Sequence, residues 1–80
     1  MLQDVIAVRP QPEFKLDIEF QNGECRQFDV RPLLSMKPWD RIASPTVFDL
    51  ARVEYGTVVW PGDVDIAPET LYDQSIPLVR

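Results

Sequence analysis

Three acidic residues stand close together near the C-terminus, where their carboxylates could bind a cation. Asp63, Asp65 and Glu69 lie between the end of an apolar run and a segment that begins with proline. Loops rich in carboxylate oxygens can hold Ca²⁺ or Mg²⁺. The spacing of a calcium-binding loop is nevertheless absent, because apolar residues interrupt the acids and no further ligand follows at regular spacing. We therefore expect no metal ion here, and we expect Asp65 to order the turn by accepting backbone N–H groups near Pro68.

Catalytic chemistry has little support in the sequence. The chain has no histidine, no glycine-rich phosphate-binding loop, and no serine or cysteine beside a plausible base. Cys25 is the only cysteine, so no disulfide can form within the chain, and the commonest general base for a thiol is missing. We expect Cys25 to act as a small apolar residue, and we expect the chain to be neither an enzyme nor a cofactor-binding protein.

The aromatic residues indicate where a protein partner could bind. Trp and Tyr are frequent at the energetic centres of interfaces, but in a small domain they more often fill the core. Trp60 lies in an apolar run and is expected in the core, whereas Trp39 lies in an irregular, proline-flanked segment and is the best candidate for exposure. Trp39 forms the predicted interaction surface together with Asp63, Glu69 and Tyr72.

Length and charge restrict the classes of function. Eighty residues suffice for one domain, predicted over residues 1–80, and 45% hydrophobic residues exclude a disordered chain. No apolar run approaches the roughly 20 residues of a membrane span. The N-terminus lacks the basic start and apolar stretch of a secretory signal, so we expect a cytoplasmic protein. The net charge of −5 argues against direct nucleic-acid binding and fits a basic protein partner better.

The clearest structural signal is a β-hairpin over residues 14–30. Apolar and charged residues alternate in its first half, which is the pattern of a strand with one buried face. A two-residue Asn-Gly turn would place the apolar residues of the second strand on the solvent side. A three-residue loop, Gln21-Asn22-Gly23, pairs Leu16 with Phe28 instead and keeps the apolar residues on one face. We therefore predict this loop, with Gly23 in the left-handed conformation.

A second hairpin is predicted over residues 51–60. Its loop is expected to be Glu54-Tyr55-Gly56, because a two-residue Tyr-Gly turn would need Tyr55 at positive φ, which is unfavourable for a bulky residue. Three apolar residues in a row, ending at Trp60, indicate an inner strand covered on both faces. Pro61 and the glycine that follows end this strand.

Shorter elements are expected elsewhere. Residues 4–8 predict a first strand, residues 9–12 a stiff proline connector, and residues 33–48, which contain two prolines, only single helical turns. A C-terminal helix is expected to begin at Pro68 and to be anchored by Leu71. The tail from residue 75 either docks along the sheet or belongs to a partner. The predicted fold is an α+β domain with one small antiparallel sheet of about five strands built from two hairpins, one short C-terminal helix and irregular proline-rich connections.

Two stretches, FQNGECRQFDVRPLL and GTVVWPGDVDIAPETLY, resemble a small bacterial family known as domain of unknown function 2442, and the match covers nearly the whole chain. The residues that carry it are Phe20, Asn22, Gly23, Phe28, Asp29, Pro32, Phe48, Trp60, Pro61, Asp65, Pro68, Leu71 and Tyr72. The chain has Pro-Gly-Asp-Val from residue 61 where the family more often has Pro-Asn-Gly-Ala, so this turn is expected to differ in shape. The resemblance implies a compact α+β domain without known activity, commonly encoded beside another small protein in the manner of a toxin–antitoxin pair.

These observations lead to two main hypotheses. The first is a non-enzymatic protein-interaction module, an antitoxin-like partner of a small basic protein encoded by the neighbouring gene. The alternative is a ligand-sensing or regulatory domain that in relatives is joined to a helix-turn-helix domain, and that here acts alone as a homodimer. The alternative predicts a small-molecule pocket. A metal-dependent enzyme is a distant third hypothesis.

Overall fold

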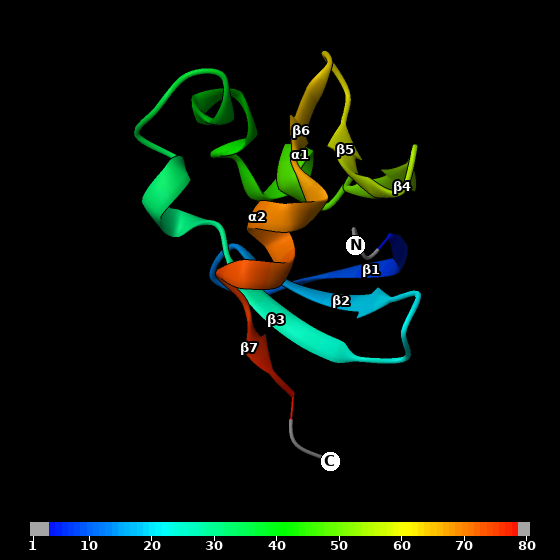
Figure 1. The fold of residues 1–80 in the computed structure, drawn as a ribbon. Helices are drawn as coiled ribbons and strands as arrows, with labels where there is room; N and C mark the ends of the chain where they lie inside the picture. The colour runs from blue at the N-terminus through cyan, green and yellow to red at the C-terminus, as the bar shows by residue number, and fades with distance from the viewer. Residues whose placement is uncertain (1–3, 79–80) are drawn as a thin grey trace.

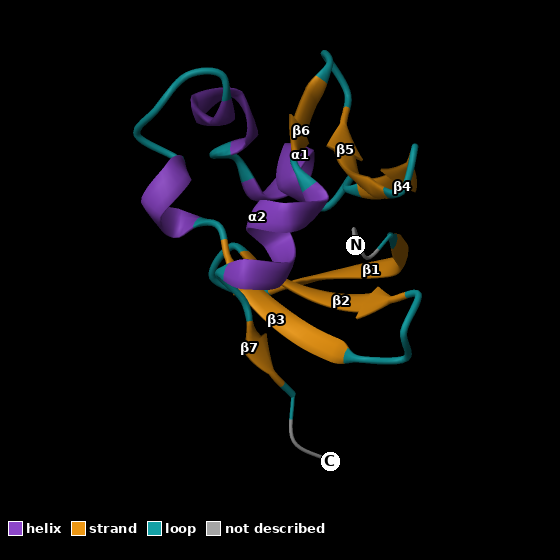
Figure 2. Cartoon of the chain, viewed as in Figure 1, coloured by secondary structure: helices purple, strands orange, loops and turns teal. Residues whose placement is uncertain are grey.

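The computed structural model describes residues 4–78, which form two antiparallel sheets that face each other, with short helices beside them (Figure 1). One sheet has the strand order β1-β2-β3-β7 and the other the order β4-β5-β6. The strands are β1 Val5–Gln11, β2 Lys15–Phe20, β3 Cys25–Asp29, β4 Arg52–Glu54, β5 Thr57–Trp60, β6 Val64–Ile66 and β7 Ile76–Pro77. Two 3₁₀ turns, η1 Arg31–Leu33 and η2 Trp39–Ile42, and two α-helices, α1 Pro45–Phe48 and α2 Pro68–Asp73, complete the fold. Figure 2 shows the helical segments gathered beside the three-stranded sheet and above β3.

The prediction of one sheet of about five strands is wrong, although both hairpins and the C-terminal helix are present. The fold is mostly β with a little helix. Each hairpin has one apolar face, and two such faces are buried by packing on each other rather than by joining edge to edge. Pro10 also lies in the edge strand β1, where it has no N–H to continue a hydrogen-bond ladder.

The first hairpin has the predicted loop and register. Leu16 lies opposite Phe28, and the Gly23 N–H donates a hydrogen bond of 2.9 Å to the Phe20 carbonyl across the three-residue loop. Gly23 has a φ of +89°, in the left-handed region that favours glycine. The alternating pattern fixed this register because a shift by one residue would have exposed the apolar side chains.

The second hairpin differs from the prediction. Its loop has two residues, because Glu54 lies directly opposite Thr57, and Tyr55 adopts a φ of +54°. A three-residue loop would have placed Arg52 opposite the buried Val58 on the inner face. Burying an unpaired guanidinium costs more than the roughly 1–2 kcal/mol of a left-handed residue, so packing overrides the local preference of Tyr55.

Three further segments correct or complete the predictions. β1 runs to Gln11 and therefore includes part of the predicted proline connector. β6 was not predicted, although Asp65 is exposed between two buried neighbours as in any half-buried strand. The tail docks along the sheet as β7, where Ile76 lies opposite Gln27 in β3. The last two residues of the chain lie outside the described range.

The core lies between the two sheets. Each sheet contributes alternate side chains from its inner face, and three helical residues close the sides. The buried apolar residues are Val5, Leu16, Ile18, Phe20, Phe28, Val30, Ile42, Phe48, Val58, Trp60, Val64, Ile66 and Leu71. Trp60 is completely buried and donates its indole N–H to the Phe48 carbonyl at 2.9 Å, which confirms the core position expected for it.

Candidate interaction surfaces

The four residues predicted to form an interaction surface play different parts in the fold. Asp63, in the turn between β5 and β6, and Glu69, in the first turn of α2, are exposed. Tyr72 is half-buried and packs edge to face on Phe20, with 5.1 Å between the ring centroids. Trp39 is also half-buried against the core, so its predicted exposure is wrong.

Trp39 and Asp65 meet in a way that the sequence did not indicate. The indole N–H of Trp39 donates a hydrogen bond of 2.9 Å to the backbone carbonyl of Asp65 in the edge strand β6. The Asp65 side chain does not brace the helix start as predicted, because α2 begins after Ala67 with no side-chain cap and Asp65 lies within a strand. Pro68 and the completely buried Leu71 have their predicted positions in α2.

The outer side of the three-stranded sheet carries a concentration of acids, which we call the acidic face. Strand register aligns Arg52, Val59 and Asp65 across its three strands. The residues that line a hollow of about 230 Å³ there are Arg52, Glu54, Tyr55, Val59, Trp60, Gly62, Asp63 and Asp65. Three carboxylates therefore face one lining guanidinium, and Arg52 is already bound to Glu54. A second cation, Arg41, lies 3.5 Å from the Gly62 carbonyl at the margin.

Tyr55 occupies an unusual position beside this face. Its side chain is 95% exposed, and its backbone lies in the left-handed region at a φ of +54°. That conformation costs a residue with a side chain about 1–2 kcal/mol, and no burial of the ring offsets the cost. Strained residues of this kind tend to occur at functional sites. Tyr55 was not predicted as a site residue because a three-residue loop was expected here, although a Tyr-Gly pair between two strands is a turn signal.

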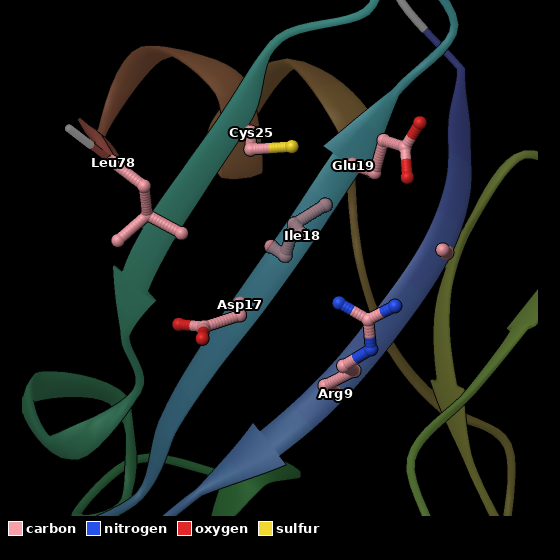
Figure 3. Close-up of a pocket in the computed structure, with 7 residues that line it drawn as sticks. Arg9, Asp17, Ile18, Glu19, Cys25 and Leu78 are labelled. Atoms are coloured by element: carbon pink, nitrogen blue, oxygen red, sulfur yellow. The ribbon is translucent and has the colours of Figure 1, made fainter. Parts of the chain in front are cut away.

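The outer side of the four-stranded sheet holds a second hollow of about 250 Å³ (Figure 3). Arg9 of β1 and the acids Asp17 and Glu19 of β2 lie on it, with Cys25 and Leu78 beside them on the β3 and β7 side. The Gln27 side chain donates a hydrogen bond of 2.9 Å to Asp17. Charges of both signs lie here, which is usual for the solvated face of an antiparallel sheet.

A polar cluster joins α2 to the four-stranded sheet. Arg26 donates hydrogen bonds to the Ser75 hydroxyl at 2.7 Å and to the Ser75 carbonyl at 2.8 Å, and it reaches Glu24 at 3.0 Å. Its guanidinium also lies over the Tyr72 ring, 4.7 Å from the centroid. The sequence position of Arg26 indicates this role. Arg26 lies two residues before the buried Phe28 in β3, so both side chains are on the inner face of the sheet.

Hydrogen bonds within this cluster shift two pKa values. The Tyr72 hydroxyl, the Asn22 amide and Arg26 all donate to Glu24, and they lower the pKa of its carboxyl. The same bond to the Glu24 carboxylate raises the pKa of Tyr72. Asn22 also accepts a hydrogen bond of 3.0 Å from the Glu24 N–H, so it orders the loop that was predicted from it.

The described part of the chain shows no group of three His, Cys, Asp or Glu side chains placed to hold a metal ion. Asp63, Asp65 and Glu69 do not form such a group: Asp63 lies in the turn before β6, Asp65 lies within β6, and Glu69 lies in α2. No helix within residues 4–78 is long and apolar enough to cross a membrane.

Comparison with known protein families gives a match that spans nearly the whole chain. Residues 5–77 match the family model described as protein of unknown function, DUF2442. The chain belongs to the DUF2442 family. No match was found among curated proteins or among solved structures. The DUF2442 match extends from β1 into β7, so it covers both sheets and confirms the resemblance seen in the sequence.

Proposed function

We propose that this chain is a non-enzymatic protein-interaction module that binds a basic protein partner through Tyr55 and the acidic face. The observation that carries the proposal is the fully exposed, left-handed Tyr55 beside three carboxylates. An exposed tyrosine supplies a large contact area with few rotatable bonds, and aromatic residues are frequent among the energetically dominant contacts of interfaces. The acids around it would attract a basic partner and orient it.

Three of the four edge strands, β1, β6 and β7, carry features that disfavour an added strand, which supports binding by side chains. Leu78 donates its N–H to Cys25 in β3, which turns the nitrogen of Pro77 toward the open edge, where proline has no N–H. Pro10 lies in the opposite edge strand, β1. In the edge strand β6, the Asp65 carbonyl already accepts a hydrogen bond from Trp39. Proline and covering side chains are devices that prevent edge pairing.

The experiment uses Tyr55→Asn. Asparagine followed by glycine suits a two-residue hairpin turn, so the variant should gain about 1 kcal/mol in free energy of unfolding while losing the aromatic contact. Urea unfolding measures the first effect. Co-expression of the tagged chain with the protein encoded by the neighbouring gene, followed by co-purification, measures the second.

Tyr55→Phe is the matched control, because it keeps the ring and the strained backbone. Wild type and Tyr55→Phe are expected to retain the partner, and Tyr55→Asn to lose it despite its higher stability. Equal retention by all three proteins would contradict a role for Tyr55, and no retention by the wild type would contradict the choice of partner.

The more specific form of the proposal is an antitoxin-like role, in which binding neutralises a harmful neighbouring protein. Expression of that protein alone should then slow growth, and co-expression of the wild-type chain should restore it. Tyr55→Asn should fail to restore growth. Normal growth without the chain would leave a binding module and remove the antitoxin role.

A further inference from the structure

A small apolar hollow lies between the β1–β2 turn and α1, away from the acidic face. Its volume is about 240 Å³, and it shares no lining residue with the hollow beside Tyr55. The residues that line it are Pro10, Gln11, Pro12, Glu13, Phe14, Pro45, Phe48 and Asp49.

The walls of this hollow are rigid. Three of the lining residues are prolines, whose rings have little freedom to lose. Phe14 and Phe48 meet edge to face with their centroids 5.2 Å apart, and Phe48 is fixed in turn by its contact with Trp60 at 5.9 Å. A ligand that enters a preformed apolar hollow loses less free energy to ordering the protein than one that must rearrange it.

The size of the hollow restricts what can fill it. Sites for drug-sized molecules usually measure about 300–1,000 Å³, so a hollow of about 240 Å³ suits one side chain better than a whole metabolite. The prolines and aromatic rings around it select an apolar side chain.

The charge at the rim restricts what can flank that side chain. Glu13 and Asp49 line the hollow, and its lining includes no basic residue. Arg31 interacts electrostatically with Glu13, but Arg31 is already held by Asp29 through contacts of 3.0 and 2.8 Å. The rim therefore keeps an excess of negative charge.

We propose that this hollow binds a basic peptide segment of a partner protein. One apolar side chain of about the size of leucine enters between the prolines and Phe14, and lysine or arginine residues on either side face Glu13 and Asp49. This site shares no lining residue with the acidic face, so the proposal does not depend on the function proposed for Tyr55.

The test is a titration of the ¹⁵N-labelled chain, followed by NMR, with the synthetic peptide acetyl-Lys-Lys-Leu-Lys-Lys-amide. Backbone resonances of Glu13, Phe14 and Asp49 should shift and saturate. A peptide with alanine in place of leucine should bind about tenfold more weakly, because it loses most of the apolar burial. A peptide with glutamate in place of lysine should produce no saturating shifts.

Variants separate this site from general attraction to an acidic protein. Asp49→Asn should weaken binding of the leucine peptide several-fold. Asp49 is exposed, so this variant is expected to keep the fold. Asp73→Asn, which makes the same charge change at the exposed end of α2, should leave the affinity unchanged. Equal binding of the leucine and alanine peptides, or shifts spread over the whole acidic surface, would overturn the proposal. Shifts of the same resonances when the chain alone is concentrated would also overturn it, because the occupant would then be a second copy.

Discussion

Glu24 shows how one side chain can depend on residues distant in sequence. Its carboxylate accepts hydrogen bonds from Tyr72, Asn22 and Arg26, and these donors hold its pKa below the ordinary value. A carboxylate whose pKa is lower in the folded than in the unfolded chain stabilises the fold at pH values above its unfolded pKa. That contribution is lost as the pH falls through the folded pKa.

Glu24→Gln should therefore lower the free energy of unfolding at pH 7 and have a smaller effect at acidic pH. The substituted amide can still accept hydrogen bonds but no longer carries a charge opposite Arg26. Urea unfolding between pH 7 and pH 3 would show the difference between variant and wild type shrinking as the pH falls. Glu19→Gln is the matched control, because the Glu19 side chain forms no hydrogen bond or ion pair with the rest of residues 4–78. A constant difference at all pH values would contradict the assignment.

The attachment of α2 and β7 to the four-stranded sheet depends on few contacts. β7 is two residues long and has only β3 as a neighbour in the sheet. Arg26 links β3 to the segment that joins α2 to β7, through Ser75, which is 49 positions away in the sequence. The Ser75 hydroxyl in turn donates to the Tyr72 carbonyl at 2.9 Å.

Arg26→Gln should loosen this attachment without unfolding the chain. The shorter side chain cannot reach both Ser75 and Glu24, so amide hydrogen exchange at Ile76 and Leu78 should become at least tenfold faster. Exchange at Val58, in the centre of the other sheet, should be limited by global stability and change less. Equal acceleration at all three amides would show that Arg26 supports the whole fold rather than the C-terminal attachment.

The two sheets are joined at one point by a backbone hydrogen bond. The Val5 N–H, at the start of β1, donates to the Gly56 carbonyl in the second hairpin turn at 2.9 Å. Gly56 has a φ of +74°, and a Cβ atom there would lie 2.8 Å from the Asp4 Cγ. Glycine is thus favoured by the positive φ of the turn, as predicted, and a Cβ atom there would also have to displace the Asp4 carboxyl group.

Comparison of Gly56→Ala with Gly23→Ala should separate the cost of positive φ from the cost of displacing Asp4. Both substitutions place alanine at positive φ, which costs about 1 kcal/mol. Gly23 has no atom within 4 Å of an added Cβ, so its variant should lose only that amount, whereas Gly56→Ala should lose more because Asp4 must also move. Thermal unfolding of both variants measures the difference. Equal losses would show that the Asp4 side chain moves aside at no cost.

Much of the local structure followed from the sequence. The alternation around Leu16 and Phe28 fixed the first hairpin and its register, because only one register buries all the apolar side chains. The position of α2 followed from Pro68, a favourable first helical residue, and from Leu71, its buried anchor. The core position of Trp60 followed from its apolar neighbours.

The sequence by itself determined the two hairpins, the start of the C-terminal helix and the acidic charge of the chain, but it did not indicate β6 or the two-residue turn at Tyr55. Tertiary structure decided which apolar faces meet, and with them the division into two sheets, the left-handed Tyr55 and the half-buried Trp39. The physical reason is that periodicity reports which face of an element is apolar but not what covers it. The interaction surface depends on that choice, because packing the hairpins face to face left Tyr55 and the acids of β4 to β6 on the outside.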